Sequence, residues 1–243
     1  SIMVVAYERT DLLRCLKQHF GFDEFLDSQE EVIRAILSGA DVFVNLATAG
    51  GKSLCYQLPA LMSDGLTIVV SPLIALMHDQ VDNLGARKIE GAYIDSTLTT
   101  AEMAKQWSAV TSGRAKLLYC SPEQLTTKSF YTKLKSTPVV RIVVDEAHCV
   151  NMWGHDFRRE YLDIPLARTR LGNPQLVAFT ATAPVLVRDD LMRSLKMENC
   201  LQIIGEMDRR NLVIDVKEFY SDSSKFDWLL QQLREHSKSG QRT

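Results

Sequence analysis

The chain has 243 residues, of which 46% are apolar and 24% are charged, a composition that excludes an intrinsically disordered protein. The length predicts one sizeable α/β core plus part of a second unit. Lys and Arg (28) nearly balance Asp and Glu (30), and the net charge of −2 therefore neither predicts nor excludes a nucleic-acid partner, because a basic face can be local.

Short β-branched runs alternate with helical stretches, a pattern that predicts parallel βαβ units. Several of the runs are apolar on both faces, as a sheet between two helix layers requires. The expected strands lie at 41–44, 67–70, 92–94, 116–120, 139–144, 176–179, 201–204 and 212–216. The expected helices lie at 11–20, 28–37, 51–62, 100–112, 127–135, 184–195 and 224–236.

Local signals set several of these boundaries. Ser28 and Glu31 have the spacing of a capping box at the start of the second helix. Ser71 and Pro72 predict the cap and first position of a further helix after strand 67–70. His78 falls on that helix, where we expect it at the surface.

No segment predicts membrane insertion or export. The longest apolar stretch, 66–77, is interrupted by a Ser-Pro pair and is too short for a bilayer, and no signal peptide is visible. The five cysteines have neither C-x-x-C nor zinc-finger spacing, which favours reduced thiols in an intracellular protein. They are Cys15, Cys55, Cys120, Cys149 and Cys200.

A phosphate site is predicted where the first strand turns into a helix. The segment 46–53 reads Leu-Ala-Thr-Ala-Gly-Gly-Lys-Ser, and the backbone N–H groups of such a turn cradle phosphate oxygens. In a P-loop, Lys52 reaches the β- and γ-phosphates and the hydroxyl of Ser53 binds Mg²⁺.

Two adjacent acids supply the second half of such a site. Asp145 and Glu146 follow the apolar strand 139–144, and the carboxyl ends of parallel strands meet at one edge of the sheet. Asp145 is expected to hold Mg²⁺, and Glu146 to orient and deprotonate the attacking water.

The Gly-Gly-Lys-Ser and Asp-Glu-Ala-His motifs resemble those of superfamily 2 helicases, and the flanking sequences narrow the resemblance to the RecQ family. Ordered matches run along essentially the whole chain. They are 20–29, 51–61, 69–80, 118–123, 145–149, 153–158 and 180–183.

This resemblance implies a 3′-to-5′ DNA-unwinding motor of repair or recombination, with ATP and Mg²⁺ between two RecA-like lobes. It implies that residues 1–206 form the first, ATP-binding lobe, with a mostly parallel sheet between helix layers. Residues 207–243 are expected to hold the linker and the opening strand and helix of a truncated second lobe. The implied partners are single-stranded and forked DNA and that missing lobe, with no membrane. The implied location is the nucleus in a eukaryote and the cytoplasm or nucleoid otherwise.

The resemblance also assigns roles to single residues. Phe22 stacks on adenine and Gln29 bonds its edge, while His148 relays between Glu146 and an aromatic-rich loop that senses DNA. The implied phosphate cradle is Thr48, Gly50, Gly51, Lys52 and Ser53. The implied DNA-binding and coupling residues are Trp153, His155, Phe157, Arg158, Thr180 and Thr182.

The chain departs from the family pattern near the expected nucleotide site and in the aromatic-rich loop. Tight nucleotide binding and the coupling of ATP hydrolysis to DNA depend on these positions. An arginine finger is expected on the second lobe, so we expect the isolated chain to bind nucleotide weakly and to hydrolyse it poorly. The departures are Leu26 for arginine, Ala47 and Ala49 for proline and glycine, Met152 for glutamine, and Arg159 and Arg210 for prolines.

Two other functions stay open. A catalytically impaired scaffold that binds DNA or protein is motivated by Leu26, Ala49 and Met152, whereas Lys52 and Glu146 argue against it. An RNA-dependent ATPase of the same superfamily is the third reading. Relatives of that kind lack the aromatic-rich loop. Whether single-stranded DNA or RNA stimulates ATP hydrolysis therefore separates this alternative from a DNA helicase.

Overall fold

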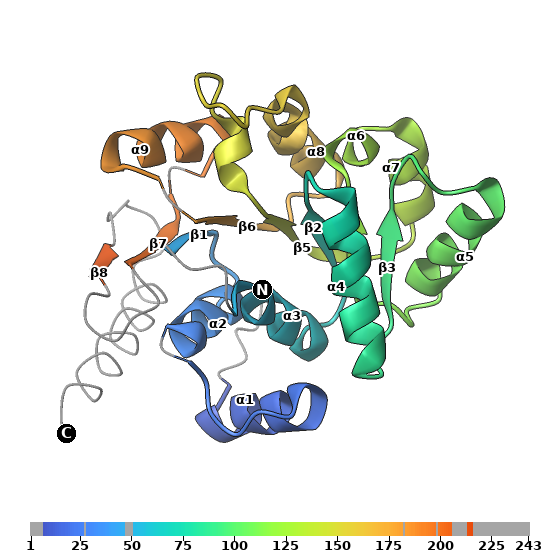
Figure 1. Cartoon of the computed structure of the whole chain (residues 1–243), viewed down its shortest axis with the longest axis horizontal. Helices are drawn as coiled ribbons and strands as arrows, with labels where there is room; N and C mark the ends of the chain where they lie inside the picture. The colour runs from blue at the N-terminus through green and yellow to red at the C-terminus, as the bar shows by residue number, and fades with distance from the viewer. Residues whose placement is uncertain are drawn as a thin grey trace.

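The computed structural model describes residues 7–26, 28–46, 51–181, 183–197, 199–205 and 213–215. These residues form an eight-stranded sheet in the order β3-β4-β2-β5-β6-β1-β7-β8 (Figure 1). Every pair of neighbours is parallel except β7 and β8, which are antiparallel. The strands are β1 Val42–Leu46, β2 Leu66–Val70, β3 Gly91–Ile94, β4 Leu117–Cys120, β5 Val139–Val144, β6 Gln175–Thr180, β7 Leu201–Gly205 and β8 Val213–Asp215.

Helices cover both faces of the sheet. Side chains of α1 to α4 pack in one apolar cluster and those of α5 to α9 in another, and successive residues of a strand alternate between the two clusters. This is the expected RecA-like α/β arrangement. The helices are α1 Arg9–Cys15, α2 Gln29–Leu37, α3 Lys52–Met62, α4 Ile74–Ala86, α5 Thr100–Thr111, α6 Pro122–Leu125, α7 Lys128–Leu134, α8 Ile164–Arg170 and α9 Val185–Ser194. Shorter turns are the π-helical η1 Leu16–Phe20 and the 3₁₀ helices η2 Ala147–Val150 and η3 Arg159–Asp163.

The expected strands are confirmed to within two residues at each end, although the sequence pattern missed α6, α8 and both 3₁₀ helices. The helix expected over 224–236 lies outside the described residues. So do most of residues 207–243, apart from the three residues of β8. None of the helices in the described ranges has the length and apolarity that crossing a bilayer requires.

Both capping predictions were wrong. Ser28 adopts a left-handed conformation (φ 67°), and its hydroxyl makes no hydrogen bond to a described group, because a side-chain cap needs an extended backbone at that position. Ser71 stays paired with the sheet, its N–H donating to the Cys120 carbonyl at 3.1 Å, so α4 begins only at Ile74.

The surface assignment of His78 was also wrong. Its side chain is two-thirds buried, with Nε2 2.8 Å from Oδ2 of the buried Asp95. The imidazole also packs on Tyr93, with ring centroids 4.1 Å apart. A polar residue on an amphipathic helix was therefore drawn inward by a buried carboxylate that the sequence pattern did not indicate.

The end of α4 is held by a left-handed residue that is not glycine. Lys88 has φ 61°, its N–H donates to the Gly85 carbonyl, and the N–H of Ile89 donates to the Leu84 carbonyl, both at 2.9 Å. These two bonds define a Schellman motif. A side chain in this conformation costs about 1 kcal/mol.

Replacing Lys88 with glycine is therefore expected to raise the free energy of unfolding by about 0.5–1 kcal/mol. This change is the backbone strain that glycine relieves minus the conformational entropy that glycine adds to the unfolded chain. Chemical denaturation measures this change. Lys105→Gly, at an exposed position inside α5, is the matched control and should lower stability by about 1 kcal/mol. A loss of stability in Lys88→Gly would contradict the account of this helix end.

Candidate functional site

The functional groups expected from the sequence gather at the carboxyl edge of the sheet, where β5, β6 and β1 are neighbours. The register pairs Val144 with Ala178 and Asn45 with Thr180, so these three strands end side by side. The chain continues from β1 into residues 47–50, which lie outside the described residues. The predictions for Thr48 and Gly50, and the departures at Ala47 and Ala49, therefore stay predictions.

The described part of the predicted phosphate loop begins at Gly51, which has φ 84° and caps α3. Lys52 follows as the first residue of that helix and is largely buried. A Cβ at position 51 would push aside the side-chain amide of Gln29, and the left-handed backbone itself requires glycine. The helix N-terminus thereby presents its N–H groups and a lysine at the sheet edge.

Asp145 and Glu146 stand at the end of β5, as predicted. The N–H of Asp145 donates to the Val70 carbonyl at 2.9 Å, which continues the pairing of β5 with β2. Glu146 has φ 53°, a conformation that is rare for a residue with a side chain, and its N–H donates to Oδ1 of Asp145 at 3.0 Å. The backbone therefore turns sharply between the two carboxylates.

The charge of Asp145 is poorly solvated. Burial raises the pKa of Asp145 above its ordinary value, the neighbouring Glu146 adds to the rise, and Lys52 opposes it. Lys52 begins α3, which follows β1, and Asp145 follows β5, so both residues stand at the carboxyl edge of the sheet. A partly buried carboxylate beside a lysine suits an additional cation.

His148 joins this pair to two other segments. Its Nδ1 lies 3.3 Å from Oε2 of Glu146 and 3.4 Å from Oγ1 of Thr180, the last residue of β6. Its Nε2 lies 3.6 Å from Oδ2 of Asp156 in the loop 151–158. The imidazole therefore contacts the acidic pair, a neighbouring strand and the aromatic-rich loop.

The aromatic-rich loop is exposed. Trp153 is 94% exposed, and Met152 and the side chains of His155 and Arg158 are also open to solvent, whereas Phe157 is half-buried. Trp153 and Met152 therefore present two large apolar side chains to solvent on this loop. The N–H of Arg158 donates to the Cys149 carbonyl at 2.9 Å, which closes the base of the loop. Thr182 lies outside the described residues, and Arg159 begins η3.

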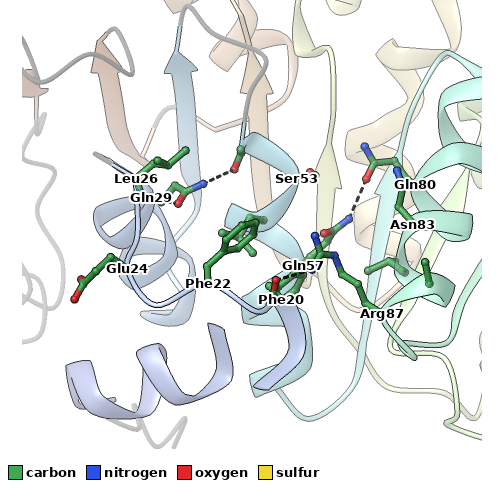
Figure 2. Close-up of a pocket in the computed structure, with 14 residues that line it drawn as sticks. Phe20, Phe22, Glu24, Leu26, Gln29, Ser53, Gln57, Gln80, Asn83 and Arg87 are labelled. Carbon is green, nitrogen blue, oxygen red and sulfur yellow. Dashed lines mark hydrogen bonds between the residues drawn. The ribbon is translucent and has the colours of Figure 1, made fainter. Parts of the chain in front are cut away.

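A cavity of about 630 Å³ opens beside the start of α3 (Figure 2). Gln29 ties its wall together, because Oε1 accepts the Leu26 N–H at 2.8 Å and Nε2 donates to the Gly51 carbonyl at 3.2 Å. Phe22 is 50% exposed and stands in the cavity, and Ser53 also faces it. The cavity therefore offers an aromatic face, an amide and the helix N-terminus in one continuous space.

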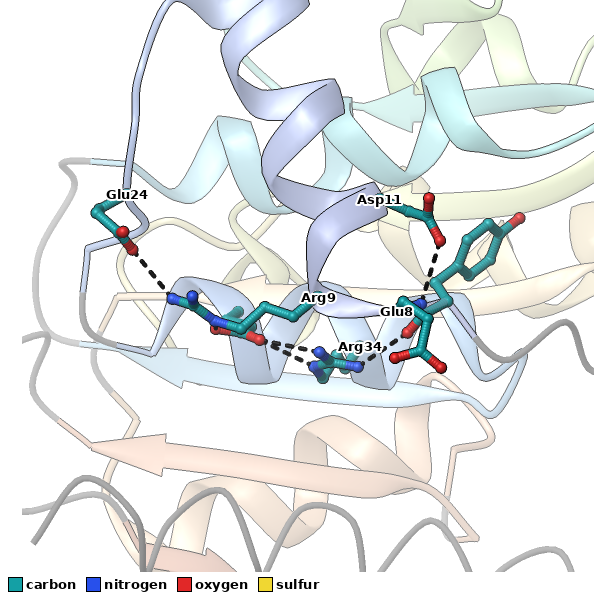
Figure 3. Close-up of polar contacts among 7 residues, drawn as sticks. Glu8, Arg9, Asp11, Glu24 and Arg34 are labelled. Carbon is teal, nitrogen blue, oxygen red and sulfur yellow. Dashed lines mark hydrogen bonds and ion pairs between the residues drawn. The ribbon is translucent and has the colours of Figure 1, made fainter.

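Ion pairs that the sequence reading missed hold the segment 21–26, which carries Phe22 (Figure 3). Arg9 pairs with Glu24 and Glu30, each at 3.0 Å, and Lys17 pairs with Asp23 at 2.9 Å. Glu30 also accepts from Arg34 at 3.0 Å. Arg9 lies 15 residues from Glu24 and 21 from Glu30, and no motif marks them as partners, whereas Glu30 and Arg34 have the i,i+4 spacing of a helix ion pair.

Two further side chains were missed at the sheet edge. The hydroxyl of the buried Tyr161 donates to the Asp145 carbonyl at 2.9 Å. Asn45 donates to the Ala183 carbonyl at 3.0 Å and accepts the Ala183 N–H at 3.3 Å. An asparagine inside an apolar strand was the available signal for Asn45, whereas the sequence held none for Tyr161.

The family model for DEAD/DEAH box helicases matches residues 27–190 of this chain. The chain is 42% identical to the ATP-dependent DNA helicase RecQ of Haemophilus influenzae, covering 96% of this chain and 37% of the relative. It is 41% identical to the probable ATP-dependent DNA helicase RecS of Bacillus subtilis (91% and 45%) and 42% identical to the ATP-dependent DNA helicase Q5 of Mus musculus (93% and 24%). The chain thus spans less than half the length of these relatives.

Solved structures agree on the fold. The DUF1998 helicase MrfA bound to DNA matches with a TM-score of 0.62 and 19% identity, covering 85% of this chain and 30% of that one. The helicase domain of Pyrococcus furiosus Hef matches with a TM-score of 0.55 and 20% identity, covering 73% and 37%. At this identity the likeness establishes the α/β fold alone.

The raised pKa of Asp145 predicts a gain of stability on removing its charge. The protonated form is favoured in the fold, so its stabilisation is present below the ordinary carboxyl pKa and is lost as pH rises through the raised value. At pH 7 without metal or nucleotide, Asp145→Asn should therefore melt at a higher temperature than the parent chain. The difference should narrow below the ordinary carboxyl pKa, at about pH 2–3, where the carboxyl is mostly protonated in both states.

Asp95→Asn is the control with the opposite sign. Burial alone raises the pKa of Asp95, but hydrogen bonds from Thr97 and His78 outweigh burial and leave that pKa below its ordinary value. Asp95→Asn should therefore destabilise the chain at pH 7, and this loss should shrink as pH falls. Equal effects of the two substitutions would show that charge burial is not the cause.

Proposed function

The chain belongs to the DEAD/DEAH box helicase family, and on that premise we propose that it is the first motor lobe of an ATP-dependent 3′-to-5′ DNA helicase of RecQ type. The observation that supports the proposal is the order of the strands: α3, whose N-terminus borders the cavity, follows β1, the Asp145–Glu146 pair follows β5, and β1 and β5 flank β6 and end at the same edge of the sheet. One nucleotide can occupy such a space, with its base in the cavity and its phosphates toward the acids. Hydrolysis there would drive unwinding in repair or recombination.

Binding begins with the base. Phe22 offers an exposed ring for stacking, and the side-chain amide of Gln29, already fixed between Leu26 and Gly51, lies at the base edge. The N-terminus of α3 then faces the phosphates, where its N–H groups and Lys52 neutralise their charge. Thr48 and Gly50 belong to the same proposed cradle.

The residues present fit a magnesium ion. Ser53 faces the cavity, and the partly buried carboxylate of Asp145, whose pKa is raised, is stabilised by a nearby cation. When bound, Mg²⁺ polarises the phosphate oxygens and neutralises the charge that develops on them. Ser53 and Asp145 are the proposed ligands, with water and phosphate oxygens in the remaining positions.

Glu146 is the proposed general base. Asp145 is the proposed metal ligand, which leaves the Glu146 carboxylate to orient the attacking water and accept its proton. His148 at 3.3 Å holds this carboxylate in place. The resulting chemistry is in-line attack of water on the γ-phosphate, driven by positioning and electrostatics.

DNA is the proposed partner of the exposed loop. Trp153 and Phe157 provide stacking surfaces for bases, while Arg158 and His155 face backbone phosphate. The contact of Asp156 with His148 gives the loop a physical connection to Glu146, and Thr180 contacts the same imidazole. Binding of a DNA strand at the loop would therefore act on His148, which positions the general base Glu146. Thr182 is proposed as part of the same link.

The proposed domain division places the first lobe at 1–206 and the linker with the start of a second lobe at 207–243. That lobe would close over the nucleotide and bring the arginine that stabilises the transition-state charge, a contribution of about three to five decades in rate. The setting is intracellular, at the site of chromosomal or nucleoid DNA.

Calorimetric titration with Mg²⁺–ADP and a non-hydrolysable ATP analogue tests the nucleotide site. Lys52→Ala should weaken binding by about 1.5–3 kcal/mol, the range for hydrogen bonds to a charged group. Lys105→Ala, an exposed lysine on α5, is the matched control and should bind as the parent does. Glu146→Gln should also keep its affinity, because its role is in the chemical step.

In a chain extended through the second lobe, Glu146→Gln should reduce hydrolysis by about 10²–10⁴-fold. Failure of the extended parent to bind nucleotide would contradict the proposal. That result would favour the alternative of a catalytically impaired scaffold. Leu26 and Met152 motivated that alternative, and both side chains are exposed in the structure.

The exposed loop is tested with labelled oligothymidine at low salt. Trp153→Ala should weaken single-stranded DNA binding by about 1–3 kcal/mol, the scale of one base stacked on an aromatic ring. Leu186→Ala, which removes another exposed apolar side chain, on α9, should have no effect. Equal affinity of parent and Trp153→Ala, or preference for RNA of the same length, would contradict the assignment.

A further inference from the structure

Arg87 lines the proposed nucleotide cavity. It lies at the end of α4, outside the segments that match the family motifs. It is the C-cap of α4, and the Schellman bonds of Lys88 and Ile89 fix the backbone on its carboxyl side. Leu84 and Ile89 are buried beneath this turn, which anchors it to the core. The guanidinium of Arg87 is therefore carried by a helix end that is anchored in the core and contacts Phe20 of η1.

The guanidinium contacts both aromatic rings of the cavity wall (Figure 2). It lies 5.6 Å from the ring centroid of Phe22 and 5.8 Å from that of Phe20, both within cation–π range. Its Nη1 also donates to the Phe20 carbonyl at 2.6 Å. One planar cation thus joins α4 to the segment that presents Phe22.

The charge of Arg87 is available to a ligand. Glu24 and Arg87 are the charged side chains among the described residues that line the cavity, and Glu24 is already paired with Arg9. Arg87 makes no salt bridge with a carboxylate in the described ranges. A purine base stacked on Phe22 offers ring nitrogens as acceptors and a polarisable face, both of which suit a guanidinium.

We infer that Arg87 is a determinant of nucleobase binding, which holds Phe22 in its stacking position and lines the base end of the cavity. This inference rests on the proposed nucleotide site and adds a residue to its specificity. Because the phosphate groups lie toward Lys52 and Asp145, Arg87 acts on the base half of the ligand alone. Its substitution should therefore separate affinity for the base from affinity for phosphate.

Competition against a fluorescent ADP derivative, in the presence of Mg²⁺, measures the dissociation constants of ADP and of inorganic pyrophosphate for the whole chain. Arg87→Ala should weaken ADP binding by about threefold to tenfold, on the scale of a partly desolvated cation–π contact. It should leave pyrophosphate binding unchanged. Arg87→Lys keeps the charge without the planar fork and should restore only part of the loss.

Arg114→Ala, which removes an exposed arginine paired with Glu90, controls for net charge and should match the parent. ADP affinity of Arg87→Ala equal to that of the parent would overturn the inference and leave the nucleotide site standing. An equal loss for ADP and pyrophosphate, or a lowered melting temperature that accounts for the loss, would overturn it in favour of a structural or general electrostatic role. Absence of ADP binding in the parent chain would instead overturn the proposed function on which the inference rests.

Discussion

The structure depends on the parallel pairing of β6 with β5 on one side and β1 on the other. Because β1, β6 and β5 are parallel neighbours, their carboxyl ends lie side by side at the same edge of the sheet. That edge brings the Asp145–Glu146 pair, Thr180 and the approach to α3 together from distant parts of the sequence. The apolar residues of both faces pack against helix layers, so these ends cannot shift without disturbing the core.

Strain and buried charge are concentrated at this edge. Glu146 has a left-handed backbone and Asp145 carries an ionised group where burial disfavours it. The fold tolerates both because the end of β5 is overdetermined, by the Val70 carbonyl on one side and the hydroxyl of Tyr161 on the other. A cation beside Asp145 would relieve the electrostatic cost of burying its carboxylate, in agreement with the metal ligand role proposed for it.

The sequence predicted the fold closely because periodicity and β-branched runs report on burial, and burial defines strands and helices here. It also indicated which residues gather at the sheet edge, since strand ends in a parallel sheet share one side. It failed where long-range partners decide the conformation. The hydroxyl of Ser28 caps nothing, His78 turns toward Asp95, and Arg87 reaches Phe22 across the cavity. The last two outcomes depend on a neighbour that is remote in the sequence and carries no motif, and the first depends on the left-handed backbone of Ser28.

The cavity at α3 and the acids of β5 are proposed to form one nucleotide site. A crystal structure of the chain with Mg²⁺ and ADP tests it most directly. We expect the base to lie against Phe22 and Gln29, the diphosphate at the N-terminus of α3, and the metal beside Asp145. Nucleotide bound on another face of the sheet, or phosphates directed away from Lys52, would contradict it.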